Sequence, residues 1–155
     1  MPIPANVTAY LTKHKVKHDI VPHRTVFTVY DLAQTLKVKL NTIVKTLLIK
    51  SDQGYHLAVL PAQKRLDIAA LKKALGFKKV SIANEKDMQT KFKVKPGAMT
   101  PFGAMHKVGV VIDRSLVKTE KMLFGAGSFT ESVRMKMKDY LRLEDPTVAN
   151  ISTKK

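Results

Sequence analysis

Residues 43–49 constrain the fold of this chain most, because they form an apolar run interrupted only at Lys45 and Thr46. A short run of this kind, rich in aliphatic residues, is typical of a buried strand. Residues 55–60 have the same character, and the turn residues 51–54 between the two runs predict a β-hairpin. Lys45 is unusual there, since a buried cation costs free energy unless an anion meets it. It either lines a pocket for a phosphate or carboxyl oxygen or extends its ammonium to solvent.

Capping signals predict several helices. Thr28 and Asp31 have capping-box spacing before a helical face that runs to Leu36. Asp67 is placed to cap a helix over residues 68–75 that ends at Gly76, and Asn84 is placed to cap a brief helix. The remaining expected elements are helices at residues 6–17 and 138–143 and strands at residues 80–82, 108–112, 122–124 and 132–135.

Helices and strands intermingle along the chain, with hairpin connections, so we expect an α+β fold with a mixed sheet. The chain has 155 residues, which suits one domain large enough to bury a core. We assign residues 1–145 to a single compact domain and expect residues 146–155, from Pro146 onward, to form a mobile tail.

The charge balance points to a polyanionic partner. The chain carries 28 Lys and Arg residues against 12 Asp and Glu residues, a formal net charge of +16. Residues 32–51 and 88–112 contain lysines but no acid. Such regions attract nucleic acid, or they serve only solubility. A membrane partner is not expected, because there is no membrane-spanning run and no basic amphipathic helix with an aromatic face. Without cysteine or a signal peptide, the cytosol is the expected compartment.

Two glycine-containing loops are the other candidates for chemistry. Residues 96–103 hold two prolines and two glycines, and the N–H groups of such a rigid loop can form an oxyanion hole or anion nest. An ordinary turn is the alternative. In residues 125–130, Ser128 and Thr130 are placed either to bind a ligand hydroxyl or to cap the turn.

Histidine and nucleophile patterns exclude several reaction classes. None of the five histidines has metal-ligand spacing, so we expect neither a metal nor another cofactor. His23 is a candidate for lining a cleft. There is no serine elbow motif and no thiol, so a hydrolase of this sequence would use water or a substrate group as nucleophile.

Taken in order, these segments resemble one family, the aminoacyl-tRNA deacylases related to the editing insertion of bacterial prolyl-tRNA synthetase (YbaK/ProX-like), many of them free-standing. The resemblance covers about residues 20–145 and rests on the lysine strand and the Gly97-to-Pro101 loop at the right separation. The segments that carry it are residues 44–48, 57–61, 65–67, 74–76, 96–103 and 125–128.

The resemblance implies a mixed sheet curled around a pocket flanked by helices. It also implies hydrolysis of the ester that joins a wrong, small amino acid to the 3′ end of a tRNA, with an aminoacyl-tRNA synthetase as a candidate partner. The expected catalytic residues are Lys45, Gly97, Ala98, Met99, Thr100 and Pro101. The expected substrate-binding residues are His23, Thr46, Phe102, Gly103, Gly127, Ser128 and Thr130.

Two alternatives stay open within the resemblance. Met99 and Phe102 either shape the pocket or belong to the core. Phe129 stands where some relatives that remove alanine have histidine, so the amino acid removed is not assigned. The competing interpretation of the whole chain is a catalytically silent module of the same fold that binds tRNA or a synthetase.

Overall fold

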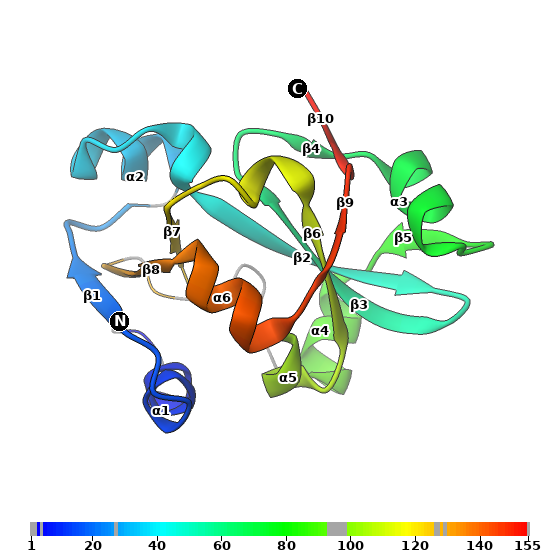
Figure 1. The fold of residues 1–155 in the computed structure, drawn as a ribbon, viewed down its shortest axis with the longest axis horizontal. Helices are drawn as coiled ribbons and strands as arrows, with labels where there is room; N and C mark the ends of the chain where they lie inside the picture. The colour runs from blue at the N-terminus through cyan, green and yellow to red at the C-terminus, as the bar shows by residue number, and fades with distance from the viewer. Residues whose placement is uncertain are drawn as a thin grey trace.

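The predicted hairpin forms the centre of the largest sheet. In it, β2 (Val44–Ser51) and β3 (Gly54–Pro61) pair antiparallel. On one side, β5 (Val80–Ile82) pairs antiparallel with the end of β2. On the other side, β6 (Gly109–Asp113) and β9 (Thr147–Ala149) add in parallel, which gives the order β5-β2-β3-β6-β9 (Figure 1).

This arrangement is seen in a computed structural model that describes residue 3 and residues 5–26, 28–92, 99–125, 128 and 130–154. The expected α+β fold with a mixed sheet in a single compact domain is confirmed. No helix in these residues is both long and apolar enough to cross a membrane.

A second, antiparallel sheet has the order β1-β8-β7, from β1 (His18–Pro22), β8 (Glu131–Lys136) and β7 (Lys121–Phe124). A bridge between Ile43 and Leu123 connects it to the start of β2. β4 (Arg65–Leu66) and β10 (Ser152–Thr153) form a separate antiparallel pair. The strands therefore divide among three sheets, and the first two meet at one end of the central hairpin.

The helices connect and cover these sheets. Their bounds, with two 3₁₀ turns, are α1 Ala5–Lys13, α2 Val29–Leu36, η1 Leu40–Thr42, α3 Ile68–Leu75, α4 Glu85–Lys91, α5 Gly103–His106, η2 Arg114–Leu116 and α6 Met137–Glu144.

The predicted caps are present. The side chains of Thr28, Asp67 and Asn84 accept hydrogen bonds from the first turns of α2, α3 and α4, at 3.0, 3.0 and 2.8 Å. Gly76 ends α3 with a φ of 70°, in the left-handed region that favours glycine. Local sequence thus sets the bounds of these three helices.

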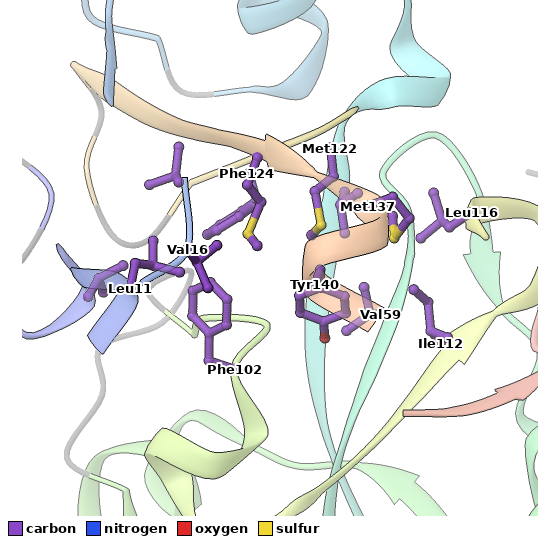
Figure 2. Packing of buried hydrophobic residues seen from close by; sticks show 14 of the residues in the cluster. Leu11, Val16, Val59, Phe102, Ile112, Leu116, Met122, Phe124, Met137 and Tyr140 are labelled. Carbon is purple, nitrogen blue, oxygen red and sulfur yellow. The ribbon is translucent and has the colours of Figure 1, made fainter. Parts of the chain in front are cut away.

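The main core lies where the small sheet meets the central sheet, α1 and α6. Tyr140 of α6, Phe124 of β7 and Phe102 are almost fully buried there together with Leu11 of α1 (Figure 2). A second cluster packs α3 against the opposite face of the central sheet. A third packs α2 against Leu123 and Val21 on the outer face of the small sheet.

The expectation of a mobile tail after Pro146 is wrong. Residues 147–149 form β9 along β6, residues 152–153 pair with β4, and Ile151 between them is fully buried. Strands of two or three residues carry too little alternation to be recognised, and their partner strands lie far away in the sequence.

The Asp113 side chain holds this C-terminal segment in place, and replacing Asp113 should destabilise the protein. Its carboxylate, which is 3% exposed, accepts hydrogen bonds from the Ile151 N–H at 2.9 Å and from Ser115. Asp113→Ala would leave a buried N–H unpaired, so we expect a loss of about 1–3 kcal/mol in the free energy of unfolding, measured by urea titration. The exposed Asp19 offers a control, and Asp19→Ala should change stability by less than about 0.5 kcal/mol. Equal effects of the two variants would contradict the role given to Asp113.

The stability that the Asp113 carboxylate contributes should depend on pH. Burial raises the pKa of Asp113, but the hydrogen bonds from Ser115, Ile151 and Ser152 outweigh it and hold the pKa below its ordinary value. The stabilisation is therefore fully present above about pH 4, where an unfolded Asp is ionised. It is lost as the pH falls through the lower pKa of the folded state.

Candidate functional site

A cavity of about 330 Å³ opens beside the first half of β2, between that strand, α2 and the end of the small sheet. Because β5 pairs only with residues 49–51, the first half of β2 has no partner strand on this side among the described residues. The cavity is lined by His23, Val26, Thr28, Leu32, Ile43, Val44, Lys45, Thr46, Leu47, Met99, Gly125, Ser128 and Ser132.

The cavity brings together five of the residues selected from the sequence, namely His23, Lys45, Thr46, Met99 and Ser128. They come from four separate parts of the chain. Lys45 is half-buried on β2, opposite Leu60 of β3. It is the only Lys or Arg among the described lining residues, and no Asp or Glu lines the cavity with it. The lining therefore favours an anionic or strongly polar ligand.

His23, directly after β1, is held by hydrogen bonds at both ring nitrogens. Nδ1 lies 2.8 Å from the carbonyl oxygen of Arg24, which can only accept, so Nδ1 carries a proton. In the neutral ring Nε2 then accepts from the Ser132 hydroxyl, 3.1 Å away. The backbone N–H of His23 also donates to the Thr130 carbonyl at 2.9 Å. His23 and Ser132 therefore present a fixed imidazole and hydroxyl pair at the cavity wall.

Ser128 and Thr130 act within their own turn. The Ser128 Oγ accepts hydrogen bonds from the N–H groups of Thr130 at 3.2 Å and Glu131 at 3.0 Å. Ser128 thus caps the turn, the second of the two roles considered for it, and also lines the cavity. Thr130 is not among the lining residues, although its carbonyl holds His23 in place.

The described part of the 96–103 loop turns from the cavity into the core. Met99 lines the cavity and packs against Leu48 and Leu57. Thr100, Pro101, Phe102 and Gly103 are buried and are not among the lining residues. Phe102 and Gly103 are used for packing, which for Phe102 is the core alternative, and their expected role as substrate contacts stays a prediction. Gly97, Ala98 and Gly127 lie outside the described residues.

The contacts of these buried residues explain their types. A Cβ on Gly103 would lie 2.4 Å from the Val110 side chain and 2.5 Å from the Val108 carbonyl oxygen, so only glycine fits. The Thr100 hydroxyl accepts from the Phe102 N–H at 3.2 Å and lies 3.0 Å from His106 Nε2. Burial lowers the pKa of His106, which favours its neutral ring.

Helix α6 fixes the end of the loop. The Tyr140 hydroxyl donates to the Pro101 carbonyl at 2.5 Å, and Glu144 accepts from the Ala104 N–H at 3.2 Å. Burial raises the pKa of Tyr140 far above its ordinary value, so the phenol remains a donor at any physiological pH. The loop therefore enters the site from a rigid anchor in the core.

Sequence reasoning missed Ser132 and most of the apolar lining. Ser132 is 2% exposed within a strand that was predicted correctly. A buried serine usually has a specific partner, but the sequence gives no sign that Ser132 is buried, because Arg134 and Lys136 follow it on the same face of the strand. No three His, Asp or Glu side chains gather where they could hold a metal ion in the part of the chain that the structure describes.

Comparisons with known proteins identify the family of this chain. The family model for the aminoacyl-tRNA editing domain matches residues 23–143. The prolyl-tRNA editing protein ProX of Acetoanaerobium sticklandii is 29% identical over 117 residues, which is 72% of this chain and 71% of that protein. The multifunctional Ser/Thr-tRNA deacylase ProXp-y of Escherichia coli K12 is 30% identical over 95 residues, covering 61% of this chain and 57% of its own length.

Longer relatives and solved structures match as well. The proline–tRNA ligase of Thermosipho africanus is 31% identical over 98 residues, 63% of this chain but 17% of the ligase. The crystal structure of hypothetical protein APE2540 superposes with a TM-score of 0.86 at 23% identity, over 95% of this chain and 99% of that one. A candidate trans-editing enzyme for prolyl tRNA synthetase superposes with a TM-score of 0.81 at 21% identity, over 95% and 94%. These structural matches establish the fold.

Proposed function

The chain belongs to the aminoacyl-tRNA editing domain family, and we propose that it is a trans-editing hydrolase that removes a small amino acid from a misacylated tRNA. The observation that carries the proposal is the placement of Lys45. It is a half-buried cation in a small cavity, the one Lys or Arg among the described lining residues, on a strand that carries the family resemblance. The 3′ end of an aminoacyl-tRNA offers a phosphate, an ester carbonyl and a ribose hydroxyl, all of which an ammonium and fixed hydroxyls can bind.

The proposed reaction is hydrolysis of the ester by water. The water oxygen attacks the ester carbonyl carbon, the carbon–oxygen bond to the ribose breaks, and the ribose oxygen leaves with a proton. The free hydroxyl of the terminal ribose positions the water, and backbone N–H groups of residues 97–100 stabilise the oxyanion. Lys45 orients the terminal nucleotide.

His23 and Ser132 define the polar wall of this arrangement. Their hydrogen bond fixes the imidazole with Nε2 toward the Ser132 hydroxyl. The Ser132 oxygen keeps a lone pair that can accept from the aminoacyl amine or a ribose hydroxyl, and the His23 ring offers its face to the terminal adenosine. His23 is therefore a substrate-binding residue in this proposal.

The size of the cavity sets the proposed specificity. About 330 Å³ is near the lower end of ligand sites, and part of it must hold the ribose. Val26, Leu32 and Met99 supply an apolar wall for a short side chain. Such a site excludes large amino acids sterically but separates small ones poorly. Alanine, serine, threonine, cysteine and proline are the candidates.

The proposed function also implies a cellular compartment and a protein partner. Charged tRNA as substrate implies the cytoplasm. An aminoacyl-tRNA synthetase is the proposed protein partner, because relatives of this domain lie within proline–tRNA ligases.

Single-turnover deacylation of tRNAs charged with the five candidates tests the function. We expect release from one or two of them well above the rate in buffer alone, since the cavity excludes by size. The control is the same tRNA charged with a large amino acid, such as phenylalanine, which should be released at the buffer rate. Tight tRNA binding with no release from any of the five would contradict the proposal and favour the catalytically silent module.

A further inference from the structure

Two further cavities lie on the outer face of the small sheet and share Lys121 and Arg134. One, of about 460 Å³, is bounded by η1 and β7, and the other, of about 350 Å³, by β1, β7 and β8. The basic residues that line them are Lys17, Lys39, Lys121, Arg134 and Lys136. We call these five residues the basic groove.

The groove lies on the same face of β8 as the candidate site. Side chains alternate along a strand, and Val133 and Met135 of β8 point into the main core. Ser132, Arg134 and Lys136 therefore share the outer face. Ser132 lines the Lys45 cavity, whereas Arg134 lines both basic cavities.

The neighbouring strands continue this face. Leu123 of β7 stands opposite Arg134, and Lys121 stands opposite Lys136. Near the site the face is apolar and covered by α2, which contacts Leu123 and Val21. Farther along β8 the residues on this face are basic, namely Arg134, Lys136 and the neighbouring Lys121. The Lys45 cavity and the groove thus lie on the same face of the small sheet, on the two sides of the segment that α2 covers.

The charges of the groove are not neutralised internally. Two acidic residues also line these cavities, Asp19 opposite Arg134 on β1 and Glu120 beside Lys121. None of the five basic residues forms an ion pair within 4.0 Å in the described part of the chain. Five cations facing two carboxylates leave a positive surface beside the site, which suits a polyanion.

We propose that the basic groove binds the backbone of the single-stranded 3′ end of the tRNA, upstream of the terminal adenosine held in the Lys45 cavity. This inference rests on the proposed function. Residues two apart on a strand are about 6.6 Å apart, comparable with successive phosphates in an extended single strand. Arg134 and Lys136 are thus spaced to meet consecutive phosphates, with Lys121 beside them. Among the described residues that line the two cavities there is no Phe, Tyr or Trp, and His18 is the one aromatic ring, so we expect recognition mainly through phosphates rather than through base stacking.

The test is binding of uncharged tRNA to a Lys121→Ala/Arg134→Ala double variant. We expect the dissociation constant to rise about tenfold at physiological salt, because two charge-assisted phosphate contacts are lost. The slope of log K against log salt should become shallower by about 1.4, or roughly 0.7 for each phosphate contact to a single strand. The charge-preserving variant Lys121→Arg/Arg134→Lys should restore most of the affinity.

The matched control is Lys72→Ala/Lys73→Ala, which removes the same charge from the exposed side of α3. It should bind tRNA nearly as the wild type does. Equal weakening by both double variants, or a tRNA lacking its single-stranded 3′ end that still distinguishes the groove variant from the wild type, would overturn the proposal.

A second readout separates this inference from the proposed function. If the wild type hydrolyses charged tRNA, the groove variant should lose more activity on tRNA than on a 3′-aminoacyl-adenosine, which lacks the preceding phosphates. If the wild type hydrolyses neither substrate but the binding difference persists, the hydrolase proposal fails and the groove stands.

Discussion

Replacing Lys45 by alanine is expected to lower the single-turnover rate of deacylation by about 100- to 1,000-fold, the usual loss when one polar contact to a transition state is removed. Lys45 is the only cation among the described residues that line the cavity. Without it, the terminal nucleotide loses its charged contact, and the ester carbonyl is no longer held against the oxyanion donors. The measurement is release of the amino acid with enzyme in excess over charged tRNA.

Lys50 provides the matched control on the same strand. It is exposed, and its ammonium lies 4.0 Å from the Asp87 carboxylate, a contact of little energetic value. Lys50→Ala should therefore keep wild-type activity and stability. Lys45→Arg keeps the charge in a wider group, so it should recover only part of the rate. A Lys45→Ala enzyme within a few-fold of the wild type would contradict the role given to Lys45.

The parts of the fold that could be predicted are those encoded locally. The hairpin follows from two apolar runs around a turn, and the starts of α2, α3 and α4 follow from Thr28, Asp67 and Asn84. Each signal lies within a few residues of the structure it determines, so reading along the chain is sufficient.

The parts that could not be predicted depend on distant partners. β1 pairs with β8 across more than a hundred residues, and β9 forms only because β6 offers its edge. The segment His18–Pro22 shows no strand pattern of its own, and it forms a strand by pairing with β8. Such strands have no local signal, since cross-strand packing rather than intrinsic preference decides them.

The residues of the candidate site divide in the same way, into those with a local sequence signal and those whose role depends on a distant partner. Lys45 could be selected because a cation is costly in an apolar strand. Ser132 could not, because its meaning comes from His23, more than a hundred positions earlier, whose ring it binds. Phe102 shows the opposite case. It lies in the loop expected to hold the substrate, but loop membership does not show whether a side chain faces a ligand or the core, and the structure buries it.

Phe102→Ala should lower the free energy of unfolding by about 3–5 kcal/mol, the usual cost of deleting a buried aromatic ring. Phe102 is 0% exposed, and its ring lies 5.4 Å from those of Tyr10 and Phe124 and 6.0 Å from that of Tyr140. The deletion would leave a cavity at the centre of the main core, among rings that cannot all move to fill it (Figure 2). Urea titration, read by far-ultraviolet circular dichroism, measures the change.

Two further variants separate packing from substrate binding. Phe102→Leu keeps most of the volume, so it should cost clearly less than Phe102→Ala. Tyr30→Ala removes an aromatic ring that is 54% exposed on α2, and its effect on stability should stay within about 0.5 kcal/mol. If Phe102 instead faced the substrate, Phe102→Ala would leave the unfolding free energy nearly unchanged and weaken substrate binding. Because the side chain lies among Tyr10, Phe124 and Tyr140, the loss should fall on stability first, and any loss of activity should follow the fraction of folded protein.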